Sequence, residues 1–467
     1  MKPSRITLFF ACVIVALAVI CAFFPSDGIT VGSRSFYLPS LHQLAESYRP
    51  SENSSDETVD TIPAEVAELS DSIKYMQTFS DSSDIRFWLP DSLYFADFWE
   101  AAENARSQGR ILRIMHYGDS QIEMDRMTSR LRTYMQETFG GGGPGMIPYR
   151  TIIPTLGVNQ STIGELVHLS SFGDSTVTRS RGNYGPMMQS FRMAGEATLS
   201  IRAATHSSVN SRVKAFSNIR LVYNNKSGSL KCTLTDRQTK TSDLQETENE
   251  GVGSMVWTLD TASTSVTLST VGNADLYCVT VDNGPGVAVD NIPMRGCSGQ
   301  QFTTVNQNFL TEAYAQLDVG LIIMQFGGNS VPYLNSEKTI ATYCRSLGRQ
   351  IDYVHRCCPQ AKILFIGPSD MSTREKGILQ TYPMLPTLID SLAATAVRHN
   401  AAFWSIYHAM GGWNSMVYWN ERGLAGSDYI HFSQRGADKM GDKLVQALAD
   451  NYQLFCLRRR LNQQTKE

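Results

Sequence analysis

The sequence has no large excess of charge of either sign. Its 467 residues include 41 lysines and arginines against 44 aspartates and glutamates, so the formal net charge is −3. Proteins that bind nucleic acid through their overall charge are strongly basic, and we therefore expect no nucleic-acid partner. The basic run Arg458-Arg459-Arg460 is too short to change this expectation and indicates a solvated helix end.

The cysteines also lack the spacing of a zinc site. Of nine in the chain, Cys344, Cys357 and Cys358 lie in or beside a helical pattern, without histidines at ligand spacing. We predict no metal and no other cofactor. Cys232 and Cys278 lie in strand-like runs and could pair in an oxidising compartment, although connectivity does not follow from sequence.

Long apolar runs are absent except at the N-terminus. The uncharged residues 6–24, ITLFFACVIVALAVICAFF, are long enough to cross a hydrocarbon core of roughly 30 Å. A cleavable signal peptide usually has a shorter apolar region and a small-x-small exit, whereas here Ile20 stands two positions before Ala22. We favour an uncleaved signal anchor over residues 1–24, with a cleaved signal peptide as the alternative.

Basic residues precede this segment, so the rest of the chain is expected to be exported. It would face the periplasm from the inner membrane or, if cleaved, be periplasmic or on the cell surface. Residues 25–83 are rich in Ser, Asp and Glu in their second half, AESYRPSENSSDETVDTIPAEVAELSDS. Such a composition buries little apolar surface and predicts a disordered, acidic tether.

Alternating strand and helix patterns begin after the tether. Asp91 is a candidate N-cap for a helix that Gly109 ends, and an apolar strand pattern covers 110–118. A helix is predicted for 121–139, where the run GGGGPG ends it. These elements form the first part, 84–148, of an α/β domain.

A different pattern covers residues 149–284. Thr, Ser, Val and Asn dominate, and short alternating stretches such as NIRLVYNN and LKCTLTD recur between turn signals. This pattern predicts an inserted β-sandwich. The α/β pattern resumes over 285–467, so the fold class is a doubly wound parallel α/β sheet interrupted by a β-module. The later helices are expected at 300–317, 336–357, 383–399 and 434–455, and the last strand at 401–410.

Four loops that follow strands of the α/β part carry reactive or hydrogen-bonding residues. Their sequences are Gly118-Asp119-Ser120, Arg295-Gly296, Gly327-Gly328-Asn329 and GSDYIHFS with Asp428 and His431. Sites in open α/β sheets form at the carboxyl ends of strands, so these loops should meet. A serine hydroxyl becomes a nucleophile when an imidazole takes its proton, and a carboxylate can orient that imidazole.

The order and content of these blocks resemble the SGNH (GDSL-type) hydrolase superfamily over about 110–145 and 287–450, and the resemblance implies its flavodoxin-like three-layer fold. It also implies that Ser120 is the nucleophile, His431 the general base and Asp428 its orienting partner. The main-chain amides of Ser120 and Gly296 and the Asn329 side chain would form the oxyanion hole; Gly299 is a rival for Gly296. The sequence contains no G-x-S-x-G elbow, which argues against an ordinary α/β-hydrolase.

Five further residues are candidates for less specific roles. Asp119 is interpreted mainly as a hydrogen-bonding residue of the turn, and it joins Gly328, Arg295, Trp413 and Met416 as candidates for substrate binding. Trp413 and Met416 fit an acyl pocket or plain core equally well.

Other candidates are set aside. A second Gly-Asp-Ser ends at Ser175, but no buried strand precedes it and no helix can follow it. His116 is expected to pack within its strand, His408 is more readily core than cleft, and Cys297 is expected to be a packed side chain.

The resemblance also implies a substrate class. An SGNH-type domain with a β-module outside the cytoplasm is similar to the O-acetylesterases of peptidoglycan and other cell-envelope glycans. We therefore predict an exported serine esterase that acts on acetylated polysaccharide or peptidoglycan and is held to the membrane by its N-terminal segment. The alternatives are an acyltransferase to glycan hydroxyls and a non-catalytic glycan-binding surface protein. The module resembles carbohydrate-binding β-sandwiches in composition only.

Overall fold

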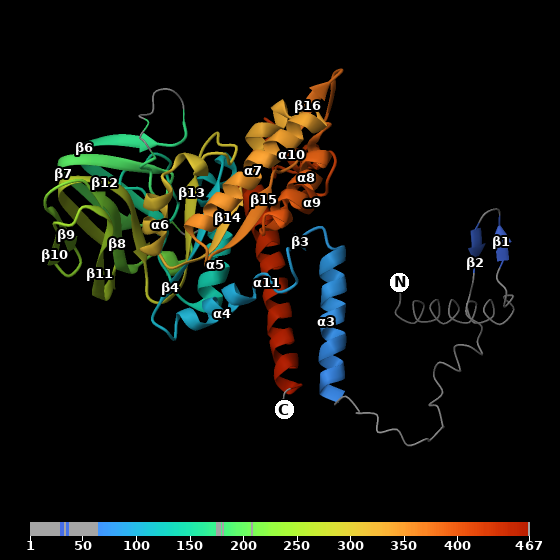
Figure 1. Cartoon of the computed structure of the whole chain (residues 1–467), viewed down its shortest axis with the longest axis horizontal. Coiled ribbons are helices and arrows are strands. Elements are labelled where there is room, and N and C mark those ends of the chain that lie inside the picture. Colours follow the sequence, from blue (N-terminus) through green and yellow to red (C-terminus); the bar gives the residue numbers. More distant parts are fainter. Residues whose placement is uncertain are drawn as a thin grey trace, which may run out of the picture. The chain divides into compact units, whose positions relative to one another are not determined.

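The computed structural model describes residues 29–31, 34–36, 64–173, 179, 182–206 and 209–465 (Figure 1). The chain divides into two units, residues 1–63 and 64–467. The described residues of the first unit form an antiparallel hairpin of β1 (Ile29–Val31) and β2 (Arg34–Phe36). The predicted membrane segment lies outside the described residues. Within the described ranges, no helix has both the length and the apolar character needed to cross a bilayer.

The second unit contains a six-stranded sheet whose neighbouring strands are parallel, except at one edge. Its central strands are apolar on both faces, as expected of a sheet covered by helices on each side. The order is β13 (Gly286–Pro293), β4 (Ile111–Gly118), β14 (Val319–Gln325), β15 (Lys362–Gly367), β18 (Ala402–Ser405) and β3 (Phe87–Trp88). The last strand, β3, is antiparallel to β18.

Helices cover both faces of this sheet. Ile114 and Ile323 pack in one core, whereas their neighbours Met115 and Ile322 pack in the other, because successive side chains of a strand point to opposite faces. The first core is covered by α4 (Ala96–Ala105), α5 (Thr128–Phe139), α9 (Ile406–Met410), α10 (Ser415–Glu421) and α11 (Gln434–Gln464). The second is covered by α6 (Gln307–Ala315), α7 (Glu337–Cys357) and α8 (Leu385–Arg398). The prediction of an α/β fold with a parallel sheet is confirmed.

A second, antiparallel sheet stands in the chain between α5 and β13. It comprises β5 (Gly145–Ile147), β6 (Val158–Ser170), β7 (Gln189–Ala203), β8 (Phe216–Asn225), β9 (Leu230–Asp236), β10 (Thr241–Thr247), β11 (Gly251–Ser263) and β12 (Ser265–Asp282). The first part of β12 pairs with β7 and β9, and its last part pairs with β8 and β5. All eight strands therefore join in one sheet through β12, and the predicted two-sheet sandwich is not confirmed.

Glycines allow the chain to pass between the two sheets. The helix α5 ends at Phe139, where the run GGGGPG begins as predicted. Gly143 has φ +86°, and a Cβ there would lie 2.4 Å from the carbonyl oxygen of Val281. Since no side chain fits at that distance, the glycine lets the segment lie directly against the end of β12.

Several element boundaries differ from the prediction. Asp91 accepts a hydrogen bond from Leu93 N in a preceding turn, and α4 begins only at Ala96. The predicted helix over 300–317 is a short turn, η3 (Phe302–Thr304), followed by α6, because Asn306 caps a new start. The predicted strand over 401–410 ends at Ser405, whose side chain caps α9. A hairpin of β16 (Ser372–Glu375) and β17 (Ile378–Thr381) was not predicted.

The prediction of a disordered tether over 25–83 is wrong for the hairpin of β1 and β2 and for its last part. Residues Ala64–Ser82 form the helix α3, which packs along α11 (Figure 1). Arg458 of α11 donates to the side chain of Gln77 at 3.2 Å. The partner helix is more than 350 residues away in sequence, so the polar composition of α3 alone did not reveal it.

The two strand cysteines do not pair, and both are buried free thiols. Cys232 on β9 lies opposite Thr270 of β12, whereas Cys278 lies eight residues farther along β12. At a rise of roughly 3.3 Å per residue the two positions are about 26 Å apart, far beyond the reach of a disulfide.

Candidate active site

Ser120 lies at the carboxyl end of β4, where it begins the 3₁₀ turn η1 (Ser120–Asp125). The side chain of Asp119 caps this turn by accepting a hydrogen bond from Gln121 N at 3.0 Å. The predicted continuous helix over 121–139 is wrong, because Met124, Asp125 and Met127 have positive φ and α5 starts at Thr128. Ser120 therefore stands on a single tight turn and not on the first turn of an α-helix.

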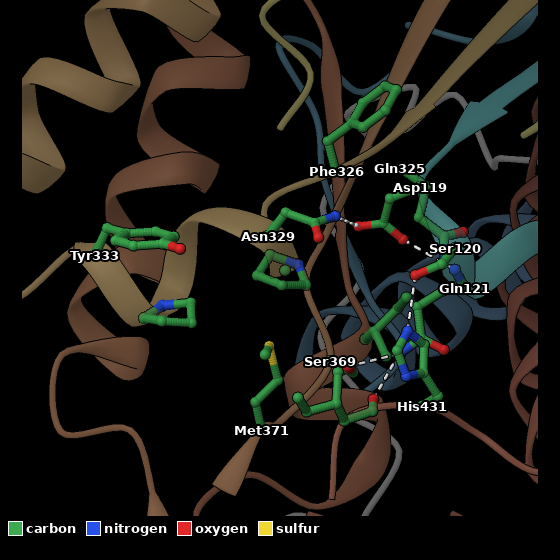
Figure 2. Close-up of a pocket in the computed structure, with 15 residues that line it drawn as sticks. Asp119, Ser120, Gln121, Gln325, Phe326, Asn329, Tyr333, Ser369, Met371 and His431 are labelled. Carbon is green, nitrogen blue, oxygen red and sulfur yellow. Dashed lines mark hydrogen bonds between the residues drawn. The ribbon is translucent and has the colours of Figure 1, made fainter. Parts of the chain in front are cut away.

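Hydrogen bonds link Ser120, His431 and Asp428. Ser120 Oγ lies 2.8 Å from His431 Nε2 (Figure 2). His431 Nδ1 lies 2.7 Å from Asp428 Oδ2. The other carboxylate oxygen of Asp428 accepts from the amides of Ile430 and His431 at 3.0 and 3.1 Å. Partial burial acts to raise the pKa of Asp428, but these hydrogen bonds outweigh it and hold the pKa below its ordinary value. The carboxylate is therefore ionised beside the imidazole at neutral pH.

Asn329 and Asp119 stand next to this chain of hydrogen bonds. Asn329 follows β14 in the turn η4 (Gly328–Tyr333), and its Nδ2 donates to Asp119 Oδ2 at 3.3 Å and to Cys297 O at 3.0 Å. Asp119 is buried, and its burial raises its pKa to about 6 against the hydrogen bonds that lower it. Its contacts suit the hydrogen-bonding role expected for this residue.

The two candidate glycines differ in their surroundings. A Cβ on Gly299 would lie 2.8 Å from the side chain of Phe326, so packing explains this glycine. A Cβ on Gly296 would meet nothing within 4 Å. In the described part of the chain, the amides of Ser120 and Gly296 donate no hydrogen bond. Both amides are therefore available to an incoming acceptor. The amide of Gly299 donates none to the described residues either, so the two glycines differ only in the close packing of Gly299 against Phe326.

A pocket of about 230 Å³ opens beside Ser120 and His431. Tyr333 lies on its opposite side, and Asn329 and Met371 stand between (Figure 2). Its fifteen lining residues are Asp119, Ser120, Gln121, Gln325, Phe326, Gly328, Asn329, Pro332, Tyr333, Pro368, Ser369, Met371, Ile406, Ile430 and His431. Apart from Gln325, the last residue of β14, and Ile406, the first residue of α9, they belong to loops and turns at or beside the carboxyl ends of the parallel strands.

Three of the predicted substrate-binding residues do not line this pocket. Met416 is fully buried in the core beneath α10 and α11, and Trp413 is about half exposed on a turn away from the pocket. Arg295 forms a two-pronged ion pair with Glu123, with both bonds at 2.6 Å. For Met416 the structure shows the core alternative, and neither Trp413 nor Arg295 lines the pocket, whereas Gly328 and Asp119 do.

The turn after Ser120 connects the other loops of the site. Asp119 accepts from Asn329, Glu123 accepts from Arg295, and Gln121 bonds to the main chain on both sides of His431. Sequence reasoning missed Gln121, Tyr333, Ser369 and Met371. Ser369 and Met371 follow the parallel strand β15, so the rule that identified the other loops could have indicated them. Nothing in the sequence distinguishes Gln121 from an ordinary helix residue.

The remaining histidine and cysteine candidates have structural surroundings. His116 is buried between Gln325 and Thr128, at 3.1 and 3.0 Å, and burial lowers its pKa to about 4. His408 packs on Trp88 outside the pocket. Burial raises the pKa of the Cys297 thiol to about 12, so the thiol stays protonated at neutral pH. Ser175 lies outside the described residues.

Comparison with known proteins identifies a fold but no sequence family. No protein-family model and no curated protein matches the chain. A solved structure described as a peptidoglycan O-acetylesterase in action is 19% identical, with a TM-score of 0.63, over 79% of this chain and 99% of its own. The chain resembles a peptidoglycan O-acetylesterase in fold. The resemblance predicted from the sequence blocks is thereby confirmed for the fold.

A second solved structure is a family two carbohydrate esterase from Cellvibrio japonicus. It is 10% identical with a TM-score of 0.25, over 64% of this chain and 99% of its own. A score this low carries no argument about the present chain.

Proposed function

We propose that this protein is an exported serine esterase that removes O-acetyl groups from a cell-envelope or extracellular polysaccharide through an acyl-serine intermediate. The observation that carries the proposal is the run of hydrogen bonds from Ser120 through His431 to Asp428 at the edge of a pocket. A serine, an imidazole and a carboxylate in this order are the parts of a nucleophilic triad. The fold shared with a peptidoglycan O-acetylesterase supports the choice of acetyl esters.

In the proposed reaction His431 Nε2 takes the proton of Ser120 as Ser120 Oγ attacks the carbonyl carbon of the acetyl ester. The Ser120 and Gly296 amides and Asn329 Nδ2 would stabilise the oxyanion. Asn329 Nδ2 already donates twice, and its longer bond, 3.3 Å to Asp119, is the one that the oxyanion would replace. His431 then gives its proton to the departing sugar hydroxyl, and a water repeats these steps to release acetate and free Ser120.

The walls of the pocket support a substrate larger than acetate. Tyr333 is 77% exposed at the edge of the pocket and adjoins Pro332. An exposed aromatic ring next to apolar walls offers a flat surface on which a sugar ring can stack. The acetyl group would enter beside Ser120 while the sugar that carries it rests against Tyr333.

The organisation of the chain extends the proposal. We assign residues 84–148 and 285–467 to the hydrolase domain and 149–284 to an inserted sandwich-like module that holds the polymer near the pocket. Remote contacts of this kind can supply binding energy to a reaction at a small acetyl group. The N-terminal segment would keep the enzyme at the membrane, facing the periplasm.

Release of acetate tests the proposal. The full chain should hydrolyse p-nitrophenyl acetate and release acetate from O-acetylated peptidoglycan, and Ser120→Ala should lower kcat by at least about 10⁴-fold. Acetylated xylan is the comparison substrate. A fluorophosphonate probe should label the wild type and not the variant. A wild type that neither turns over these esters nor reacts with the probe contradicts the proposal and favours a glycan-binding protein.

A further inference from the structure

The side chain of Gln121 joins the turn of Ser120 to the loop of His431. Its Nε2 donates to the carbonyl of Ile430 at 2.7 Å, and its Oε1 accepts from the amide of Phe432 at 3.3 Å. These two groups flank His431 in the chain. Gln121 thus holds the main chain on both sides of the imidazole, while its own main chain follows Ser120 directly.

A third hydrogen bond of the Gln121 carboxamide joins it to the loop after β15. Gln121 Nε2 also donates to Ser369 Oγ, in the loop after β15, at 3.3 Å. Gln121 is 8% exposed, so both amide protons and the carbonyl oxygen find protein partners away from solvent. In Figure 2 Gln121, Ser369 and His431 lie together below Ser120.

The loop that carries His431 depends on few such attachments. The side chains of His431 and Asp428 are 38% and 47% exposed, and Tyr429 between them has a positive φ of 56°. Main-chain bonds from Gly426 and Ser433 hold the loop to its own neighbourhood, and Ser372 N at the start of β16 donates to Tyr429 O at 3.2 Å. Among the described residues, the side-chain bonds that join this loop to the turn of Ser120 come from Ser120 itself and Gln121.

We infer that Gln121 is a positioning residue that fixes the distance and angle between Ser120 Oγ and His431 Nε2. The inference rests on the proposed function, because the geometry it protects matters only if His431 takes the proton of Ser120. A carboxamide suits this role, since it offers the donor that Ile430 O needs and the acceptor that Phe432 N needs. A glutamate of the same size has no proton for Ile430 O when ionised, and its charge would face that carbonyl.

Gln121→Ala and Gln121→Glu test the inference, with Gln350→Ala as the matched control. Gln350 is also buried, and its carboxamide likewise bridges a main-chain amide and a side chain, both of Thr303, but it does not line the pocket. Both Gln121 variants should lower kcat for p-nitrophenyl acetate by about 10²-fold, the loss expected when reacting groups are misplaced by about 1 Å, with little change in KM. Gln350→Ala should lower the urea midpoint to a similar extent as Gln121→Ala and leave kcat at the wild-type value.

Crystal structures of the variants supply a readout that is independent of activity. The distance from Ser120 Oγ to His431 Nε2 should exceed 2.8 Å in Gln121→Glu and stay unchanged in Gln350→Ala. Wild-type kcat in both Gln121 variants, or an equal loss of kcat in Gln350→Ala, overturns the positioning role and leaves the esterase proposal intact. A wild type without turnover or probe labelling overturns the esterase proposal and this role with it.

Discussion

The parallel sheet and the antiparallel sheet of this protein differ in where their accessible side chains lie. All fifteen residues that line the pocket belong to the α/β part, and none comes from residues 145–282. The parallel strands are covered by helices on both faces, so their loops are the places where polar side chains gather at one edge. The antiparallel sheet instead has outer strands with exposed positions, such as Ile163 on β6 and Leu244 on β10. The pocket is therefore formed by the α/β region alone, whereas the exposed apolar positions of the antiparallel sheet lie outside it.

The two regions meet at a buried ion cluster, whose disruption should have the largest effect. Arg113 of β4 bonds to Asp290 of β13 at 2.6 Å and to Asp282 at the end of β12. Arg113→Met leaves two buried carboxylates without their partner and should lower the free energy of unfolding by about 3–5 kcal/mol. Urea unfolding followed by tryptophan fluorescence measures the loss.

The exposed pair Arg110–Asp318 provides the control. Its bond is also 2.6 Å long, but both side chains are about 40% exposed, so Arg110→Met should cost about 1 kcal/mol or less. If Arg113→Met produces two separate transitions instead of one earlier transition, the two regions are independent folding units. Equal losses in the two variants would contradict the assignment of a buried cluster.

Loss of an amide donor should affect the two regions unequally. Asn329→Ala removes the proposed side-chain donor of the oxyanion hole and should lower kcat for p-nitrophenyl acetate by about 10²–10³-fold. Asn224→Ala in β8 removes a buried amide that bonds to Asn183 and Tyr277, and it should affect stability only. Steady-state kinetics on both purified variants checks this. Wild-type kcat in Asn329→Ala would remove the residue from the proposed mechanism.

The smallest expected effect is the change of the free energy of unfolding with pH. Its sign differs between an aspartate of the parallel region and an aspartate of the antiparallel region. Burial raises the pKa of Asp119 from 3.8 to about 6, so between about pH 4 and pH 6 the folded protein holds a proton that the unfolded chain has lost. This group therefore makes stability fall as pH rises through that window, by at most about 3 kcal/mol. Asp119→Asn should remove this part of the slope in urea unfolding measured at several pH values.

Asp236 of β9 should behave in the opposite way. Its burial acts to raise its pKa, but hydrogen bonds from Ser263 and Thr239 outweigh it and lower the pKa below 3.8. Its contribution to stability is present above about pH 4 and is lost as pH falls through the lowered pKa. Asp236→Asn should therefore destabilise the protein at pH 6, with the difference shrinking toward pH 3. Parallel pH profiles of the Asp119 and Asp236 variants would contradict the contrast.

Much of the parallel region could be predicted because its signals are local. Apolar runs followed by Gly-Asp-Ser or Gly-Gly-Asn mark strands that end in a loop. The helix α7 begins at Glu337, directly after the capping residue Ser336, which was its predicted start. Ser120, His431 and Asp428 were predicted from their loops, and the structure brings them together. The break between η1 and α5 was missed, since the positive φ angles of the non-glycine residues Met124, Asp125 and Met127 go against local preference.

Contacts over long sequence separations account for the other misses. The helix α3 packs against α11, which lies far away in the sequence. The side chain of Gln121 bonds to Ile430, 309 residues away, and Met416 packs in the core and not in the pocket. The pairing of β12 with four strands could not be read from alternation, because every strand of the region has the same period.

Residue order alone was enough for the strand–loop pattern and for the reactive residues in those loops, since apolar periodicity and turn residues act between near neighbours in the chain. Only the tertiary structure determines which of these side chains contact one another. His431 reaches Ser120 across 311 residues, Gln121 holds the loop of His431, and Arg295 turns to Glu123 instead of the pocket. These contacts depend on the order of strands in the sheet and on packing across it, which bring together residues that share no local signal.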